Sequence, residues 1–213
     1  ARGNSGVILS QLFRGFSQYI PAGKKTITVN EFAQAFKNGV DAAYRAVMRP
    51  VEGTMLTVAR EAAEMMIAES RREKDIVTVV QKGINHAEKT LSKTPEMLKA
   101  LRDAKVVDAG GKGLIFIMKG FLQALMQPES DIGELALESI SDNEVTIYQE
   151  STEDIKYTYC TELFITGRQI DVEAIKNKLS TLGDSLIVIG MNDLVKIHIH
   201  SNHPGMVMEE ALR

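Results

Sequence analysis

Two groups of residues in this 213-residue chain have types and spacings that could do chemistry. The first group, Gly3, Asn4, Ser5 and Gly6, stands directly before a helical pattern. A helix N-terminus presents unpaired N–H groups and a partial positive charge, which suit a phosphate. Glycine allows a close approach of the backbone, and Ser5 could cap the helix or donate to a phosphate oxygen. A simple capped helix start has the same pattern, so this segment alone leaves both interpretations open.

The second group combines the single cysteine with two histidines. Polar and apolar residues alternate around His198 and His200, so both histidines point to one face of a strand. The strand pattern around Cys160 places its thiol opposite the apolar side chains. If the strand that carries Cys160 is the neighbour of the strand that carries both histidines, the three side chains share one sheet face. One Cys with two His suits Zn²⁺. Water, a substrate group, His203 or Glu162 would take the fourth position, and a polar sheet face with a free cysteine is the alternative.

The elements that would position these residues change near residue 127. Up to residue 126 apolar residues recur at helical spacing, and no strand alternation precedes residue 140. After that we expect strands at 145–148, 157–166, 186–189 and 194–201, with helices at 172–182 and after His203. From residue 157 this order is a ferredoxin-like split βαβ unit that lacks its last strand.

Capping residues predict where the helices of the first part begin. A capping box opens at Thr28, and Thr54 and Asp75 could cap the next two helices. Thr94 followed by Pro95 predicts another helix start, with proline at the first helical position. The fold class is therefore a multidomain α and α+β chain.

The balance of basic and acidic residues changes at the same point of the chain. The chain carries 25 Lys and Arg against 28 Asp and Glu, and a net charge of −3 argues against a general nucleic-acid binder. Residues 1–126 hold 19 basic and 12 acidic residues, whereas residues 127–213 hold 6 and 16. We therefore expect a helical domain at 1–126, a linker at 127–143 and an α+β domain at 144–213.

Composition also indicates the cellular compartment in which the protein would be found. One cysteine excludes an internal disulfide framework and favours a reducing, cytoplasmic compartment. No run approaches the roughly 18 apolar residues that would span a bilayer, and no signal-peptide pattern opens the chain. The chain starts on Ala1 and ends at Arg213 inside a helical pattern, so we expect a piece of a longer protein, truncated at both ends.

Three ordered motifs carry a resemblance to a known family. They are ARGNSGVILSQLFRGF from Ala1, RPVEGTMLTV from Arg49, and VVDAGGKG from Val106, which we expect to form a glycine-rich turn before an apolar helix at 114–126. Together they resemble the helical nucleotide-binding domain of the dihydroxyacetone-kinase L-subunit type. More closely, they resemble the nucleotide-binding subunit of bacterial fatty acid kinase, whose middle domain is similar to the second part of this chain.

The resemblance implies an all-helical barrel, here partial, that binds ATP at one rim. The first motif would face the nucleotide phosphates, the second would lie near the adenosine, and the third would close the rim. The family's middle domain is also associated with a Cys/His metal site. The residues that carry over are Gly3, Asn4, Ser5 and Gly6 in the first motif, Thr54 and Met55 in the second, Asp108 and Gly110 in the third, and Cys160, His198 and His200 for the metal.

One departure from the family concerns magnesium. The family places a loop with three aspartates before the first motif, and those carboxylates hold two Mg²⁺ ions that phosphoryl transfer requires. No D-x-D cluster occurs in the 213 residues. We therefore expect the chain alone to be inactive as a kinase. Its helical domain should also be open on one side, with apolar surface that invites oligomerisation such as a homodimer.

The function that the resemblance implies is ATP-dependent phosphorylation of a fatty acid carboxylate presented by a separate lipid-carrier protein. One alternative is a dihydroxyacetone-like kinase acting on a small molecule, although the simple sugar-kinase type lacks a second domain of this kind. Another is a non-catalytic regulatory module that binds nucleotide and metal. No nucleic-acid partner and no transmembrane segment are expected.

Overall fold

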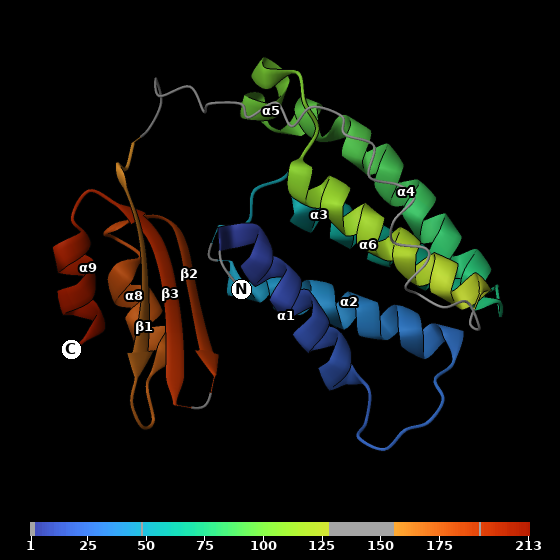
Figure 1. Cartoon of the computed structure of the whole chain (residues 1–213), viewed down its shortest axis with the longest axis horizontal. Helices are drawn as coiled ribbons and strands as arrows, with labels where there is room; N and C mark the ends of the chain where they lie inside the picture. Colours follow the sequence, from blue (N-terminus) through green and yellow to red (C-terminus); the bar gives the residue numbers. More distant parts are fainter. Residues whose placement is uncertain (1–2, 48, 128–155, 192) are drawn as a thin grey trace.

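The computed structural model describes residues 3–47, 49–127, 156–191 and 193–213. The strand expected at 145–148 and nearly all of the expected linker lie outside these residues. Figure 1 shows a helical part followed by a smaller part in which helices cover a sheet. This agrees with the predicted α and α+β class, whereas the partial helical barrel stays a prediction.

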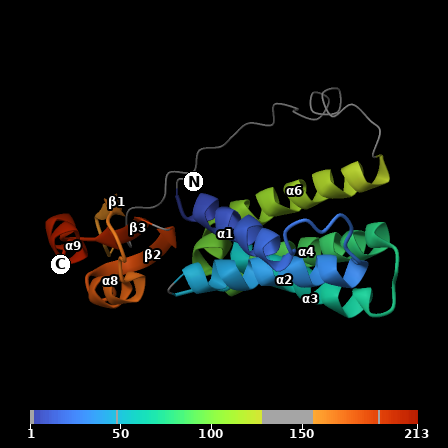
Figure 2. The same cartoon turned by 90° about the horizontal axis from the view of Figure 1, so that it is seen from below.

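The described residues up to 127 contain helices that lie side by side (Figures 1 and 2). Their core is built largely from small and aliphatic side chains, which lets the helices approach closely. The capping box at Thr28 is present, because its hydroxyl accepts from the Glu31 backbone and the Glu31 carboxylate accepts from the Thr28 backbone. The helices are α1 (Gly3–Tyr19), α2 (Val29–Ala46), α3 (Met55–Ser70), α4 (Ile76–Met97), α5 (Lys99–Ala104) and α6 (Ala109–Met126).

The predicted helix start at Thr94 is wrong. Helix α4 continues through Pro95 to Met97. Proline lacks the N–H that would donate to the carbonyl four residues earlier, which belongs to Leu91. The Thr94 hydroxyl donates to that carbonyl at 2.7 Å, so the acceptor is satisfied and the helix continues. The glycine-rich turn is also corrected, because α6 begins at Ala109 and Gly110 lies in its first turn.

Helices α1 and α2 cross at two glycines. A Cβ atom on Gly39 would lie 2.4 Å from the Leu12 carbonyl oxygen, and one on Gly15 would lie 2.7 Å from the Asn38 carbonyl oxygen. The Asn38 amide donates to the Gly15 carbonyl at 2.7 Å across the same crossing. The crossing therefore sets where α1 lies, and with it the residues of its first turn.

The sheet has the strand order β1–β3–β2, with β3 antiparallel to both neighbours. The predicted adjacency of the first and third strands, counted from residue 157, is thus confirmed. Helices α8 (Val172–Leu179) and α9 (Pro204–Ala211) pack on one face around Ile197 and Ile199, which are fully buried. The strands are β1 (Tyr159–Thr166), β2 (Gly183–Met191) and β3 (Leu194–Ser201).

Strand β2 contains a β-bulge. Asp184 pairs with His200, but the next paired residue, Ile187, faces His198, so one extra residue is inserted between them. Ser185, inside the bulge, has a φ of 52°. The insertion reverses the alternation, and as a result Asp184 and Ile187 point to the same face of the sheet.

The edge of the sheet at β2 lies against the helical part (Figure 1). Ile187 and Ile189 form a small buried cluster with Val7 of α1. Val47, at the end of α2, makes an isolated antiparallel bridge to Ile187, and the Arg14 guanidinium donates to the Gly190 carbonyl at 3.4 Å. The two parts of the chain are therefore in direct contact near the start of α1.

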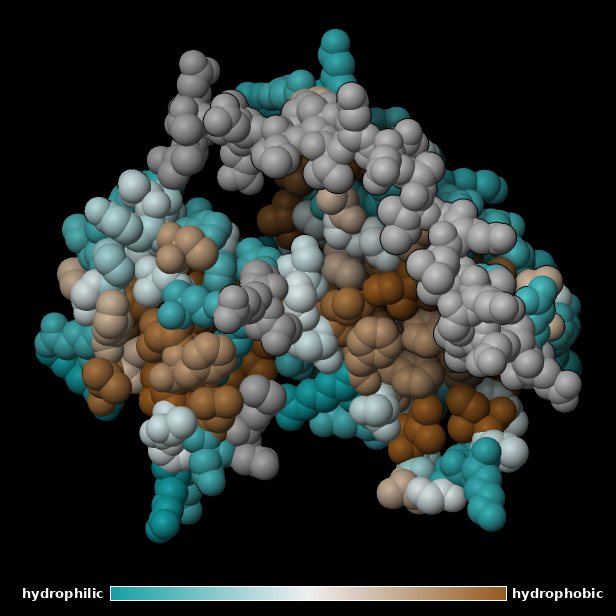
Figure 3. All heavy atoms as spheres, viewed as in Figure 1, coloured by the Kyte–Doolittle hydropathy of each residue, from teal (hydrophilic) through white to brown (hydrophobic). Residues whose placement is uncertain are grey.

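A hollow of about 550 Å³ lies between α1, α2 and α6, and its lining is almost wholly apolar. Apolar side chains gather over the helical part on the face seen in Figure 3. Phe13 and Phe121, at its rim, are 41% and 49% exposed. Among the described helices, none has both the length and the apolarity that a membrane crossing requires.

Candidate functional site

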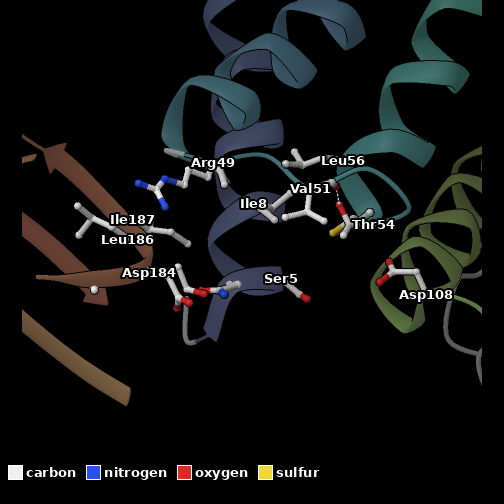
Figure 4. Close-up of a pocket in the computed structure, with 15 residues that line it drawn as sticks. Ser5, Ile8, Arg49, Val51, Thr54, Leu56, Asp108, Asp184, Leu186 and Ile187 are labelled. Atoms are coloured by element: carbon white, nitrogen blue, oxygen red, sulfur yellow. Dashed lines mark hydrogen bonds between the residues drawn. The ribbon is translucent and has the colours of Figure 1, made fainter. Parts of the chain in front are cut away.

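A hollow of about 210 Å³ lies where the β2 edge meets the helical part. Figure 4 shows Ser5 of α1 between Asp184 of β2 and Asp108 at the start of α6. The helical part and the sheet both contribute to its wall. The lining residues are Asn4, Ser5, Ile8, Val47, Arg49, Val51, Thr54, Met55, Leu56, Asp108 and Gly183 to Ile187.

Three helix N-termini converge on this hollow. Helix α1 contributes Asn4 and Ser5 from its first turn, α3 contributes its N-cap Thr54 with Met55, and α6 contributes its N-cap Asp108. Each N-terminus carries unpaired N–H groups and roughly half a positive elementary charge from the helix dipole. Such ends favour an anion, and at two of them the Asp108 carboxylate already accepts from backbone N–H groups, those of Gly111 in α6 and Met55 in α3.

The α1 residues in the hollow have unused hydrogen-bonding capacity. The Asn4 side-chain oxygen is buried without a hydrogen-bond partner among the described residues. Oxygen and nitrogen of an amide are interchangeable by a flip, so the same position could hold either an acceptor or a donor. Ser5 is exposed beside it, at the helix end. An orphaned polar atom inside a hollow is what a polar ligand would satisfy.

The loop between α2 and α3 is held by a network below the hollow. Arg60 of α3 binds Glu52 through two nitrogens at 2.8 and 3.1 Å, and Glu52 accepts from the Thr57 hydroxyl at 2.9 Å. Thr54 is the N-cap of α3, as predicted, but its hydroxyl donates to the Val51 carbonyl and makes no cap bond. The network fixes the loop that carries Arg49, which is one of the residues that line the hollow.

Asp108 is held at the start of α6 from two sides. Its carboxylate accepts from the Gly111 N–H at 2.6 Å, and its own N–H donates to the Thr94 hydroxyl at 3.1 Å. Burial raises the pKa of Asp108, although its backbone hydrogen bonds oppose that shift. A Cβ atom on Gly110 would lie 3.3 Å from the Ser5 hydroxyl and 3.2 Å from the Met55 Cβ, so glycine keeps this corner open.

The cysteine and the two histidines come together on the sheet face away from α8 and α9. Cys160 of β1 pairs directly with His200 of β3, and the ligand atoms of Cys160, His198 and His200 lie within 4.8 Å of one another. The Cys160 Sγ is 4.0 Å from the ring nitrogens of His198. Zinc bond lengths place tetrahedral Cys and His ligand atoms about 3.5 Å apart, so small side-chain rotations would close the site.

The protonation of the cluster suits a metal. Burial lowers the pKa of His198, and the neighbouring His200 lowers it further. A neutral imidazole is the form that binds a metal, and a thiolate with two imidazoles is a common set of zinc ligands. The donors present therefore fit Zn²⁺.

Neither candidate for the fourth ligand belongs to the cluster. Glu162 forms an ion pair with Lys196 at 2.5 Å, and His203 is the N-cap of α9. His86 of α4 lies 3.2 Å from a carboxylate oxygen of Glu61, and it belongs to no group of three metal-binding side chains among the described residues.

The structure brings most of the sequence-predicted nucleotide residues together. Asn4, Ser5, Thr54, Met55 and Asp108 line one hollow, although they are up to about a hundred positions apart in sequence. Gly110 lies directly behind them. The remaining two, Gly3 and Gly6, belong to the same first turn of α1 but are not among the residues that line the hollow.

Two charged residues of the hollow were missed from the sequence. Arg49 is the first residue of the second motif, and a positive charge next to Pro50 in a loop could have indicated an anion-binding side chain. Asp184 gave no signal, because only the bulge and the contact between the two parts place it there. Its carboxylate lies 3.5 Å from the His200 Nδ1, so it touches the cysteine–histidine cluster as well as the hollow.

Comparison with known proteins gives the class of this chain. A family model described as the DAK2 domain matches residues 1–123, and a second, for the middle domain of FakA-like fatty acid kinase proteins, matches residues 156–213. The chain belongs to the DAK2 domain family. Its two matched segments together make it similar to the FakA-like component of a fatty acid kinase.

Individual relatives agree along almost the whole chain. Protein YloV of Bacillus subtilis is 45% identical over 221 residues, covering 99% of this chain and 40% of the relative. Uncharacterised proteins of Staphylococcus epidermidis and Staphylococcus aureus are 44% and 41% identical over 214 residues, covering 97% of this chain and 39% of each relative. The chain thus spans about 40% of the length of the curated relatives it matches.

Proposed function

We propose that the hollow binds the phosphates of ATP, as the nucleotide site of a kinase. The observation that carries this proposal is the convergence of the N-termini of α1, α3 and α6 on one hollow. The dipoles of these ends and the N–H groups that Asp108 does not already bind, with the Asn4 amide and the Ser5 hydroxyl, would hold the phosphate oxygens. The Arg49 guanidinium would add a fork of donors, and Thr54 and Met55 would lie against the adenosine.

The substrate that we propose is the carboxylate of a fatty acid, presented by a separate carrier protein. The match of residues 156–213 to a fatty acid kinase middle domain supports this choice over a small ketone or polyol. In the reaction a carboxylate oxygen would attack the γ-phosphorus, and the bond from that phosphorus to the β–γ bridging oxygen would break. The products would be an acyl phosphate and ADP.

Metal ions enter the proposal in two places. Mg²⁺ would neutralise the charge that develops on the phosphates, but the chain offers no group of three aspartates to hold it. We infer that the 213 residues bind nucleotide and do not turn over. Cys160, His198 and His200 would bind Zn²⁺, whose positive charge would lie on the sheet face next to the hollow.

One observation favours a second function. Within the described residues the carboxylates that line the hollow are Asp108 and Asp184, and they come from different parts of the chain. A hollow with these two carboxylates next to a metal cluster also suits a regulatory module that binds nucleotide and metal without catalysis. Under either function we expect the domain limits 1–126 and 144–213 with a linker at 127–143, a cytoplasmic location and self-association through the apolar face.

The test is a titration of the chain with a fluorescent ATP analogue, with and without Mg²⁺. We expect saturable binding that Asn4→Ala weakens by about tenfold or more, because a hydrogen bond to a charged group is lost. The matched control is Asn177→Ala, which changes an exposed asparagine on α8. Absence of binding by the unchanged chain, or equal affinities for both variants, would contradict the proposed site.

Catalysis is tested by transfer of labelled phosphate from ATP to a fatty acid on its carrier. The kinase proposal predicts no transfer by the 213 residues alone and transfer once a polypeptide with the three-aspartate loop is joined to residue 1. Transfer that never occurs, together with intact nucleotide binding, would favour the regulatory module.

A further inference from the structure

Asp184 occupies a position that both candidate sites share. It lines the hollow at the N-termini of the helices, and its Oδ1 lies 3.5 Å from the Nδ1 of His200. His200 in turn lies directly opposite Cys160 on β1. The three residues form a row across β2, β3 and β1, because Asp184 and Cys160 are both register partners of His200. The row leads from the hollow into the metal cluster.

The nearby Asp184 carboxylate favours one tautomer of His200 over the other. A carboxylate beside Nδ1 favours a proton on that nitrogen, which leaves Nε2 as the lone-pair donor. Histidines that bind metals usually donate their other N–H to a carboxylate, and this partner fixes both the tautomer and the ring orientation. Asp184, whose Oδ1 lies 3.5 Å from the His200 Nδ1, is placed to be that partner.

The β-bulge makes this arrangement possible. Regular alternation from Ile187 and Ile189, which pack against Val7, would turn residue 185 and not Asp184 to this face. The extra residue in the bulge returns Asp184 to the face of the cluster. One strand thereby contacts α1 through its apolar side chains and His200 through its carboxylate.

We propose that Asp184 is a positioning residue that couples metal binding in the Cys160, His198 and His200 cluster to nucleotide binding in the hollow. The inference rests on the proposed nucleotide and zinc sites. Without metal, the carboxylate presents a negative charge to the hollow, which opposes a phosphate. With Zn²⁺ on Cys160 and the two histidines, the cluster carries a net positive charge that offsets this carboxylate, so each ligand strengthens the binding of the other.

The experiment measures both affinities in the 213-residue chain and in Asp184→Asn. Chain loaded with Zn²⁺ and freed of excess metal is compared with chelator-stripped chain in titrations with a fluorescent ATP analogue. Zinc affinity is measured by competition with a chromophoric chelator, and Co²⁺ absorption reports the ligand geometry. The matched control is Asp171→Asn, because Asp171 is the N-cap of α8 and asparagine serves as well in that position.

In the unchanged chain we expect zinc to tighten nucleotide binding by about tenfold, within the usual range of coupling between sites. In Asp184→Asn the zinc affinity should fall by about 10- to 100-fold, as for other carboxylate partners of metal-bound histidines. The zinc effect on nucleotide binding should also nearly vanish, while the metal-free variant binds nucleotide at least as tightly as the metal-free unchanged chain.

Two results would overturn the inference alone: equal nucleotide affinities of the zinc-loaded and stripped unchanged chain, or full coupling retained in Asp184→Asn. Failure of the unchanged chain to bind nucleotide, or to bind zinc, would overturn it together with the corresponding proposed site. Because the unchanged chain is measured first, the two kinds of failure are distinct.

Discussion

Replacing glycine by alanine should have opposite effects on stability at Gly39, in the crossing of α1 and α2, and at Gly120 in α6. In Gly39→Ala the new Cβ would lie 2.4 Å from the Leu12 carbonyl oxygen, whereas ordinary contacts begin at 3.4 Å. Backbone atoms must supply the missing 1.0 Å, so α1 and α2 would have to separate. In Gly120→Ala, inside α6, the new Cβ would meet no atom within 4 Å.

The magnitudes follow from two opposing effects. Alanine gains about 1 kcal/mol over glycine in a helix interior. Overpacking a core costs about 1–3 kcal/mol, and a clash with backbone belongs at the upper end. We expect Gly39→Ala to lose about 2 kcal/mol of unfolding free energy and Gly120→Ala to gain about 0.5–1 kcal/mol.

The assay is urea denaturation followed by the helical circular dichroism signal, with the m-value compared between variants. Because α1 carries Asn4 and Ser5, Gly39→Ala should also weaken nucleotide binding, whereas Gly120→Ala should leave it unchanged. A Gly39→Ala chain as stable as the unchanged one would refute the close crossing. A Gly120→Ala chain that lost stability would show that the propensity argument fails here.

Three further predictions concern the sites. Gly110→Ala places a methyl group between Ser5 and α3 and should weaken nucleotide binding. Gly113→Ala, in the same helix, places its methyl group in open space and should leave binding unchanged. Fluorescence titration of both variants with an ATP analogue tests this difference. Cys160→Ser should abolish stoichiometric zinc in metal analysis, and zinc retained at the unchanged level would remove Cys160 as a ligand. Folding raises the pKa of Asp108 above its usual 3.8, so its contribution to stability is fully present below about pH 3.8 and is lost as pH rises through the folded-state pKa. The unfolding free energy of the unchanged chain, relative to that of Asp108→Asn, should therefore decline as the pH rises above about 3.8, and a rising difference would contradict the burial argument.

Local patterns predicted much of the fold and the grouping of Cys160 with His198 and His200, whereas the residues of the hollow were predicted from the family resemblance. Alternation around His198 and His200, with the adjacency of the first and third strands, was enough to bring Cys160 to them, because strand period and register determine the face. The capping box at Thr28 was likewise visible in four residues. Such features depend on neighbours in the sequence or on a regular strand order.

Other features depended on contacts that no local pattern records. Pro95 continues its helix because the Thr94 hydroxyl replaces a missing donor, an exchange that residue types alone do not indicate. Asp184 reaches His200 because a bulge breaks the alternation on which strand prediction relies. The hollow itself forms only where β2 meets the helical part, so its sheet wall could not be predicted from either part separately.

The bulge in β2 also bears on which changes of length the chain could tolerate. Single-residue deletions are usually accepted near strand ends, where loops absorb them. Removing Ser185 would take out the extra residue, and regular alternation would then keep Asp184 and Ile187 on one face and Leu186 on the face covered by α8 and α9. That deletion should therefore keep both contacts of the strand, the apolar one to α1 and the carboxylate beside His200. Removing Val188 would have the opposite effect, because Ile187 and Ile189 would become adjacent and only one of them could still face α1.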